Sequence, residues 1–377
     1  MRKLAMVDLK SQYDHIKPEI DAAIEKVISS TSFINGPVVK EFQADLEAYL
    51  GVKHVIPCGN GTDALQVAMM ALGLKPGDEV IAPSFTFIAT AEVIALLGLT
   101  PVLVDVDPGT FNIDPAAIKK AISSKTKAIV PVHLFGQSAD MDAIMKIAED
   151  HGLFVIEDAC QAIGADYIKT DGSKAKVGTI GHVGCTSFFP SKNLGCYGDG
   201  GAIFTNDDDI AKKLRSVVNH GMTVRYYHDD IGVNSRLDSI QAAVLKVKLP
   251  HLDEYAAARN KAAAAYDKAF GGHPSVSIPA RFPASTHVFH QYTLVLNGVD
   301  RAALLEHLSQ KEVPAMVYYP VPIHLQKAYL DPRYQPGDFP VTESLSKSVF
   351  SLPMHTELDE EQLNYITGAV LGFLDRK

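Results

Sequence analysis

Residues 54–73, HVIPCGNGTDALQVAMMALG, contain the pattern that decides the fold: a short apolar run, a glycine-rich turn and a helical stretch. The run His54–Cys58 predicts a strand, and Thr62–Leu72 predicts a helix that ends at Gly73. The same alternation of strand and helix continues to residue 157. It predicts an α/β fold in which helices cover both faces of a mostly parallel sheet.

The rest of the chain divides into expected elements by the same reasoning. Strands are expected at 79–82, 102–106, 128–134, 154–157, 185–189 and 202–205, and helices at 87–97, from Pro115, and at 141–151, 208–219, 235–248 and 252–270. Beyond about residue 272 the chain is richer in proline and aromatic residues, which is typical of a smaller α+β unit. We therefore predict a large domain of residues 1–250, with an N-terminal arm, and a small C-terminal domain of residues 251–377.

Composition excludes several classes of protein. The chain has 377 residues and a formal net charge of −9, which argues against a nucleic-acid partner or an anionic membrane surface. Its four cysteines show neither a metal-binding spacing nor a disulfide framework, so no metal is expected. No segment has the length and apolarity of a signal peptide or a membrane span, so we expect a soluble, cytoplasmic protein.

The turn Gly59–Asp63 lies where the first predicted strand ends and a helix begins. Free N–H groups and the helix dipole at such a position favour an anion such as a phosphate. A capped turn that needs glycine only for its geometry would have the same sequence. The turn is not GxGxxG, and no acidic residue ends the next strand, which disfavours a dinucleotide-binding dehydrogenase.

The run Val155–Gln161 places Asp158 at the carboxyl end of an apolar strand. Open α/β sheets bind their ligands at that edge, and a buried carboxylate needs a partner. The protonated nitrogen of a pyridinium ring would be a suitable partner, because an ionised carboxylate keeps that nitrogen protonated. A metal ion or a helix N-terminus is an equally good explanation of this motif when it is considered alone.

Lys192 lies in the apolar segment Thr186–Gly195, and further glycines follow at 198–201. Apolar surroundings desolvate an amine and lower its pKa, which leaves a neutral nucleophile able to form an imine. Most lysines are surface residues, so this segment alone is also indecisive. Together with Asp158 and the turn at 59–63, however, Lys192 completes the phosphate cradle, ring partner and imine-forming amine that pyridoxal 5′-phosphate (PLP) requires.

The chain resembles the DegT/DnrJ/EryC1/StrS family of nucleotide-sugar aminotransferases along nearly its whole length. The matching segments are Val7–Leu9, NGTDAL (60–65), PSFTFIATA (83–91), EDACQ (157–161), SFFPSKNLGCYGDGGA (187–202), GVNSRLDSIQAA (232–243) and YPVPIHLQ (319–326). This resemblance implies the PLP-dependent transferase fold of the aspartate aminotransferase type (type I), with PLP as the cofactor.

The resemblance also implies a role for each matching position. Lys192 matches the Schiff-base lysine, which also shuttles a proton during the reaction. The other cofactor positions are Asp158 for the pyridine nitrogen, Gln161 for the ring hydroxyl, Gly61, Thr62 and Ser187 for the phosphate, and Phe87 for the ring face, where an aromatic residue could equally belong to the core. Asn234 matches a residue that reaches the phosphate of the partner subunit's cofactor, which implies an obligate homodimer with composite active sites.

The sugar nucleotide is expected to meet a second set of residues. Tyr318, Tyr319 and His324 match the region that lines the family's substrate pocket, although the tyrosines could instead serve only in packing. Arg236, two positions after Asn234, is a further candidate to cross the dimer interface.

Within the family, the pattern is most similar to enzymes that aminate C3 of a UDP-linked 2-acetamido-3-keto-hexuronate for surface polysaccharide of the O-antigen type. The amino donor of such enzymes is L-glutamate, which leaves as 2-oxoglutarate. Arg225 or His228 would then meet the C6 carboxylate, because a buried carboxylate favours a charge-assisted partner, although the loop that carries them could instead be only a solvated loop. Subfamilies that act on dTDP-3-keto-6-deoxyhexoses or UDP-4-keto sugars share most of these motifs and are the alternative. A PLP protein without transaminase activity is less expected, because the dehydratase branch replaces the imine lysine by histidine.

Overall fold

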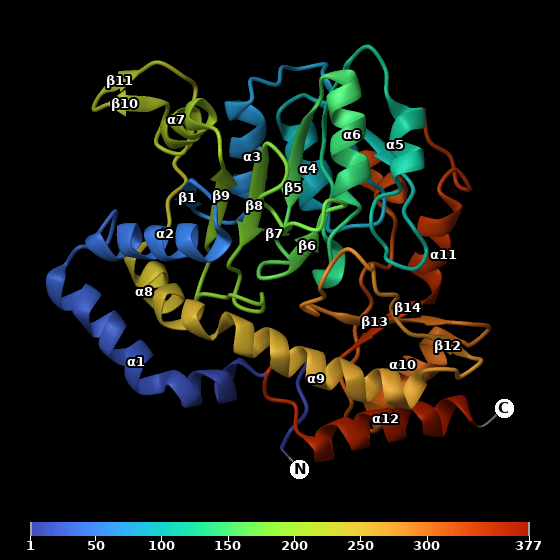
Figure 1. The fold of residues 1–377 in the computed structure, drawn as a ribbon. Coiled ribbons are helices and arrows are strands. Elements are labelled where there is room, and N and C mark those ends of the chain that lie inside the picture. The colour runs from blue at the N-terminus through green and yellow to red at the C-terminus, as the bar shows by residue number, and fades with distance from the viewer. Residues whose placement is uncertain (1, 376–377) are drawn as a thin grey trace.

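The computed structural model describes residues 2–375 and centres on one seven-stranded sheet with the strand order β1-β9-β8-β5-β4-β2-β3 (Figure 1). Its strands are β1 (His54–Cys58), β2 (Glu79–Pro83), β3 (Thr100–Val104), β4 (Thr126–Ile129), β5 (Phe154–Asp158), β8 (Val183–Ser187) and β9 (Gly201–Thr205). Strand β9 runs antiparallel to both of its neighbours, and the remaining neighbours pair in parallel. The prediction of a mostly parallel sheet is confirmed.

Helices cover both faces of this sheet. They are α2 (Pro37–Leu50), α3 (Gly61–Ala71), α4 (Ala89–Leu96), α5 (Pro115–Ala121), α6 (Met141–His151), α7 (Asp208–Val217) and α8 (Ser239–Lys248). Because side chains alternate along a strand, Val80 and Ala82 join the core beneath α3, α4 and α7, while Ile81 joins the core beneath α5 and α6. At the β1 edge, α2 and α8 cover Val55 and Phe204.

The C-terminal part is a smaller α+β unit around a three-stranded antiparallel sheet. Its elements are α9 (Leu252–Phe270), β12 (Val276–Ser277), β13 (Tyr292–Leu296), α10 (Arg301–Gln310), α11 (Pro340–Ser348), β14 (Val349–Leu352) and α12 (Glu360–Leu374). All of these elements except α11 share one apolar cluster that includes Tyr266, Leu294 and Ile366. The expected α+β character of this part is confirmed, whereas the domain boundary between 250 and 251 stays a prediction.

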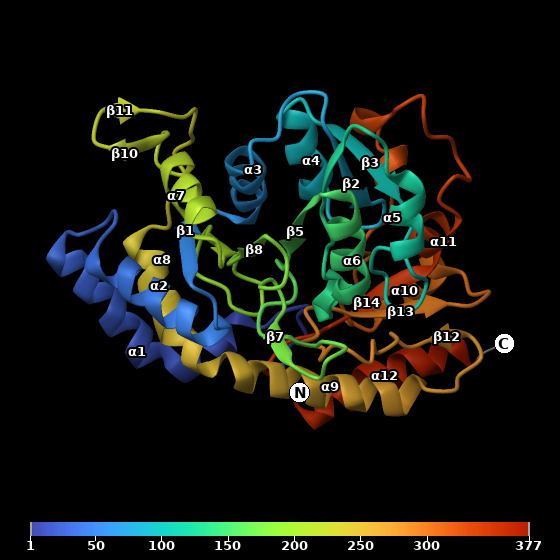
Figure 2. The ribbon, with the colours of Figure 1, turned by 45° about the horizontal axis from the view of Figure 1, so that its top comes forward.

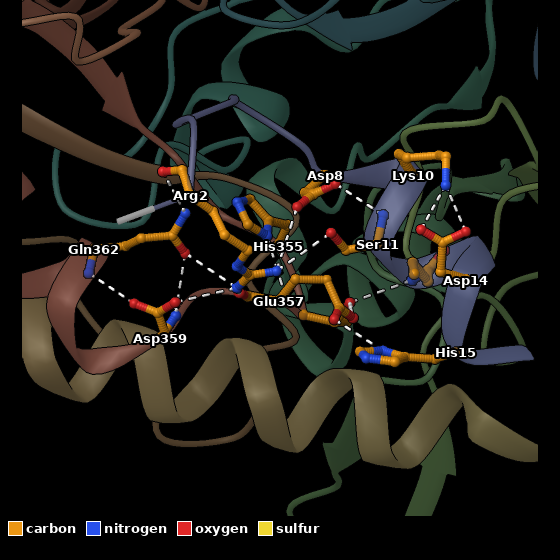
Figure 3. A network of polar contacts seen from close by, with 12 residues as sticks. Arg2, Asp8, Lys10, Ser11, Asp14, His15, His355, Glu357, Asp359 and Gln362 are labelled. Carbon is orange, nitrogen blue, oxygen red and sulfur yellow. Dashed lines mark hydrogen bonds and ion pairs between the residues drawn. The ribbon is translucent and has the colours of Figure 1, made fainter.

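The N-terminal residues connect the two parts of the molecule. Helix α1 (Leu9–Ser30) packs on α8, while the segment before it crosses to the C-terminal unit, where Leu4 enters the apolar cluster. Figure 3 shows the polar contacts of this crossing, among them the ion pair of Arg2 with Asp359 at 3.2 Å. The ring of His15 on α1 also contacts Glu357, at 3.0 Å.

Two hairpins extend from this framework. One consists of β6 (Asp166–Ile168) and β7 (Lys174–Lys176), and the other of β10 (Met222–Val224) and β11 (Tyr227–His228). The β10–β11 hairpin projects from the body of the molecule beyond α7 in both ribbon views (Figures 1 and 2). Within residues 2–375, no helix has the length and apolarity needed to cross a membrane.

Several predicted boundaries are wrong by a few residues. The strand expected at 128–134 ends at Ile129, because Pro131 has no N–H to donate and Leu134–Gly136 form a 3-10 turn. The helix expected from 235 begins at Ser239, because the preceding residues are extended and Asn234 bridges to Asn219. The helix expected from 87 begins at Ala89.

Candidate active site

The carboxyl ends of three strands bring the predicted motifs together. Asp158 on β5 lies opposite Cys185 on β8, and Gly201 on β9 lies opposite both Ser187 and Cys58. The turn after β1, the end of β5 and the end of β8 therefore meet at one edge of the sheet. This is the edge at which open α/β sheets bind ligands.

The turn after β1 forms a cradle at the N-terminus of α3. The side chain of Asn60 caps the helix by accepting from the Asp63 N–H at 2.8 Å. A Cβ added at Gly61 would lie 2.7 Å from the Ser187 Cβ, so the turn and β8 approach closely only because residue 61 is glycine. Within residues 2–375, the N–H groups of Gly61 and Thr62 have no acceptor, and these donors are suited to a phosphate.

Asp158 is buried at the carboxyl end of β5. Its two oxygens accept hydrogen bonds from the Cys160 N–H at 3.1 Å and from the Thr90 hydroxyl at 3.2 Å. No ion pair within the described residues includes it. The carboxylate therefore has unused acceptor capacity, and the protonated nitrogen of a pyridine ring would satisfy it.

Lys192 lies on the loop between β8 and β9 and is half-buried. Burial lowers the pKa of its amine, although the nearby Cys160 and Asp158 act in the opposite direction. In the part of the chain that the structure describes, its Nζ makes no hydrogen bond or ion pair, while its backbone N–H donates to the Phe189 carbonyl at 2.8 Å. The result is an amine with reduced proton affinity beside a carboxylate, as imine formation requires.

Gln161 connects the cofactor side of the site to the C-terminal unit. Its Oε1 accepts from the Phe135 N–H at 2.8 Å, and its Nε2 donates to the Tyr319 hydroxyl at 3.1 Å. The Tyr319 ring lies 6.2 Å from the ring of Phe87, which is 53% exposed. Phe87 is therefore not a core residue of this chain, and its face is available to a ligand. Tyr318 precedes Tyr319 and is half-buried.

The remaining predicted substrate residues make contacts that do not include Asp158, Gln161 or Lys192. His324 is buried, its Nε2 is 3.1 Å from Glu343 and its ring packs edge-on against Phe339. Arg225 is exposed at the tip of the β10–β11 hairpin, where it stacks on Tyr226 at 4.9 Å. His228, on the same hairpin, has its Nδ1 2.8 Å from the His220 carbonyl.

The two interface candidates flank a residue that does contact the cradle. Asn234 is exposed and Arg236 is half-buried. Between them, the Ser235 hydroxyl accepts from the Gly59 N–H at 2.9 Å and donates to Asp63 at 2.7 Å. This segment therefore packs against the cradle of its own chain, and the exposed Asn234 faces away from the buried Ser235.

The sequence pattern did not reveal every residue of the site. Thr90, which donates to Asp158, and Ser235 lie inside matched motifs, so the motifs contained this signal. His290 carried no such signal. It is buried with an unpartnered Nδ1, and its pKa is held well below the usual range by burial and by the charges of Lys192 and Arg259. Folding brings the segment of His290 to the Lys192 loop. The side chain of Asn193, next to Lys192, donates to the carbonyl of Val288 at 2.9 Å, and Val288 precedes His290 by two residues.

These residues fit PLP. The free donors of the cradle suit a phosphate, the free acceptor capacity of Asp158 suits the ring nitrogen, and the uncommitted amine of Lys192 suits an aldehyde. The exposed ring of Phe87 lies next to Tyr319, whose hydroxyl accepts from Gln161.

Comparison with known proteins agrees with this geometry. The profile of the DegT/DnrJ/EryC1/StrS aminotransferase family matches residues 14–371. The chain is 46% identical, over 97% of its length and 99% of the relative's, to UDP-2-acetamido-2-deoxy-3-oxo-D-glucuronate aminotransferase of Pseudomonas aeruginosa. It is 49% identical to a pleiotropic regulatory protein of Geobacillus stearothermophilus, with 98% of each chain covered.

A solved structure gives the same result at the level of the fold. The crystal structure of S. venezuelae DesV, in complex with a ketimine intermediate, superposes with a TM-score of 0.95. It is 39% identical and covers 100% of both chains. The fold is therefore that of the type I PLP-dependent transferases, as the resemblance implied. The chain belongs to the DegT/DnrJ/EryC1/StrS aminotransferase family and is a PLP-dependent transaminase.

Proposed function

We propose that this transaminase moves the amino group of L-glutamate onto C3 of a UDP-2-acetamido-3-keto-hexuronate and releases 2-oxoglutarate. The observation that carries this proposal is the 46% identity, over nearly the full length of both chains, to a relative named for the 3-oxo-glucuronate substrate. The product would be a 2,3-diamino uronate for surface polysaccharide of the O-antigen type, made in the cytoplasm.

The residues of the site support an amino-transfer reaction. When bound, PLP supplies an electron sink for the negative charge that develops on the substrate carbon. Gly61, Thr62 and Ser187 would hold its phosphate, and Asp158 would keep its ring nitrogen protonated. The side-chain amide of Gln161, which donates to the Tyr319 hydroxyl, would also orient the ring hydroxyl of PLP.

Lys192 would carry out the proton transfers. Its Nζ would take the proton from the carbon of the amino donor and return a proton to the carbon of the sugar that accepts the amine. A lowered amine pKa favours this role, because a protonated Nζ cannot accept a proton. The hydrogen bond from the Lys192 N–H to Phe189 holds the backbone while the side chain moves.

A homodimer would explain why Arg225, His228 and Asn234 are exposed in their own chain. The projecting hairpin places Arg225 and His228 in solvent, where they could reach the C6 carboxylate of a substrate bound by the partner (Figures 1 and 2). Asn234 is exposed at the base of this hairpin and would complete the partner's phosphate cradle. Each active site would then contain residues from both subunits.

A substrate panel tests this proposal. Purified enzyme with PLP and L-glutamate is incubated with the UDP-linked 3-keto-hexuronate, a dTDP-3-keto-6-deoxyhexose or a UDP-4-keto sugar, and the amino sugar is quantified by mass spectrometry. The largest kcat/KM is expected for the uronate, and the Lys192→Ala variant should form no product from any sugar. A larger kcat/KM for either alternative sugar would replace the uronate assignment, while leaving the transaminase assignment intact.

A further inference from the structure

Lys248, at the end of α8, is a buried cation that the amino-transfer chemistry does not use. It is 2% exposed, and no ion pair among residues 2–375 gives it a carboxylate partner. Burial lowers its pKa to about 8. Burying an amine without a counter-ion destabilises a fold, and a methionine would fill similar space at less cost. The position therefore requires an explanation other than packing.

The contacts of Lys248 lead to the loop that carries Lys192. Its Nζ donates to the Gly195 carbonyl at 2.8 Å and lies 5.0 Å from the centre of the Tyr197 ring. Gly195 and Tyr197 follow Lys192 by three and five residues. A hydrogen bond from a charged donor and a cation–π contact thus both act on this one short segment.

A second side chain of α8 holds the same segment. Gln241 lies two helical turns before Lys248, on the same face of the helix. Its Oε1 accepts from the Tyr197 N–H at 2.8 Å, and its Nε2 is 3.4 Å from the Tyr197 carbonyl. A Cβ at Gly198 would come within 2.8 Å of the same Nε2, so the loop lies directly against the helix.

The loop transmits this restraint to Lys192 because it folds back on itself. The Cys196 N–H donates to the Phe188 carbonyl at 2.8 Å, and the Lys192 N–H donates to the neighbouring Phe189 carbonyl. A Cβ at Gly195 would lie 2.3 Å from the Pro190 carbonyl oxygen, which shows how closely the two limbs approach. A displacement of residues 195–197 would therefore displace the backbone of Lys192.

The restraint also reaches the N-terminal helix. The ring of Tyr13 on α1 packs edge-on against the ring of Tyr197, with 6.0 Å between centres. Tyr197 is thus contacted by Lys248 and Tyr13, from two helices that pack on each other.

We propose that Lys248 is a positioning residue for Lys192: together with Gln241, its ammonium fixes the loop at residues 195–197 and so fixes the position from which the Lys192 amine acts. This role goes beyond the identity of the sugar, and its test needs no sugar substrate.

The test compares amide hydrogen exchange in the PLP-free, full-length protein and in its Lys248→Met variant. We expect the amides of Lys192, Cys196 and Tyr197 to exchange about tenfold to a hundredfold faster in the variant, as the loss of a hydrogen bond from a charged donor implies. The central sheet should be unchanged. Lys248→Arg should restore slow exchange, because it keeps the cation.

Lys246→Met is the matched control. Lys246 lies on the same helix, but it is partly exposed and pairs with Glu41. Its replacement should leave exchange in the loop as in the wild type. Unchanged loop exchange in Lys248→Met, or equal acceleration in the sheet, would overturn the proposal, because the second result indicates general destabilisation. If Lys248→Met does not fold, Gln241→Ala is judged by the same two criteria.

A second readout follows the cofactor rather than the loop. After PLP is added and the protein is treated with borohydride, peptide mass measures how much PLP is fixed covalently to Lys192. Lys248→Met should fix it more slowly than the wild type, whereas Lys248→Arg and Lys246→Met should not. Equal rates in all four proteins would contradict a positioning role.

Discussion

At position 61, the space between the turn after β1 and β8 admits only a hydrogen atom. A Cβ there would meet the Ser187 Cβ at 2.7 Å and the Cys160 Sγ at 2.9 Å. We expect Gly61→Ala to lower the free energy of unfolding by about 1–3 kcal/mol, as overpacking does, and to weaken PLP binding. Urea denaturation and a fluorescence titration with PLP measure the two effects.

Gly368→Ala is the control for this prediction. Gly368 lies exposed inside α12, and a Cβ there would meet nothing within 4 Å. Alanine should therefore raise the free energy of unfolding by about 0.5–1 kcal/mol through its helix propensity, with PLP affinity unchanged. If Gly61→Ala bound PLP as tightly as Gly368→Ala, the cradle would not be at residue 61.

His355 gives the fold a predictable response to acid. It is buried and its Nε2 has no partner, and burial together with the charge of Arg259 lowers its pKa from 6.5 to about 4. Because the pKa of His355 is lower in the folded state, the unfolded state binds the proton at a higher pH. Folding stability is therefore lost as the pH falls from 6.5 towards 4. The difference of 6.5 − 4 corresponds to about 3 kcal/mol at the lower end of this window.

His355→Asn should remove most of this acid sensitivity. In the wild type, the His355 Nδ1 accepts a hydrogen bond from the Glu357 N–H at 3.2 Å. The side-chain oxygen of the asparagine can accept the same hydrogen bond, but asparagine does not titrate. Urea unfolding at pH 7 and pH 4.5 should show a smaller loss of stability in the variant than in the wild type. An equal loss in both proteins would mean that other groups, such as the buried His287 and His290, account for the acid response.

At the scale of elements, the β10–β11 hairpin tests the choice of sugar. Arg225 lies at its exposed tip and has no carboxylate partner among the described residues. If Arg225 pairs with the C6 carboxylate, Arg225→Ala should raise KM for the 3-keto uronate about tenfold or more, as the loss of a charge-assisted hydrogen bond implies. The matching sugar with a C6 alcohol should be affected much less. Equal effects on the two sugars would assign Arg225 a structural role.

The bounds of an element were predictable from the sequence where the signals that set them are local. Met141–His151 was predicted with its correct bounds because Asp140 caps its start and Gly152 adopts the left-handed conformation at its end. The start of α8 was not predicted, because residues 235–238 are held extended by partners distant in sequence, including the Phe33 carbonyl, which accepts from the Ser239 N–H. Such pairing has no local signal.

The same distinction applies to the site. Lys192 and Asp158 could be proposed from the sequence because their motifs occur together with the turn at 59–63 and match the family's segments, whereas neither motif is decisive alone. His290 and Lys248 were not, because each meets the Lys192 loop from more than 50 residues away: the charge of Lys192 lowers the pKa of His290, and the Lys248 Nζ donates to the Gly195 carbonyl. The parts of the site that depend on long-range packing therefore had to come from the structure.

At the scale of the whole molecule, the proposed homodimer with composite active sites predicts that two inactive variants can complement each other. In Lys192→Ala the amine is absent from a subunit's own site, and in Asn234→Ala the contribution to the partner's cradle is absent. Each variant alone should be inactive or strongly impaired. In a mixed dimer, the site that contains the intact Lys192 receives the intact Asn234 from the other subunit, so one of its two sites is complete.

Equal amounts of the two variants, unfolded and refolded together, should therefore regain about one quarter of wild-type activity, because half of the dimers are mixed and each has one complete site. The same variants refolded separately, then mixed and assayed without delay, should show no gain. This mixture controls for residual activity of the two variants. Restored activity that titrates with the fraction of mixed dimers would establish that Asn234 acts across the interface. If the mixture stays as inactive as its components although native mass spectrometry detects mixed dimers, Asn234 serves its own subunit, and the exposed hairpin base must have another partner.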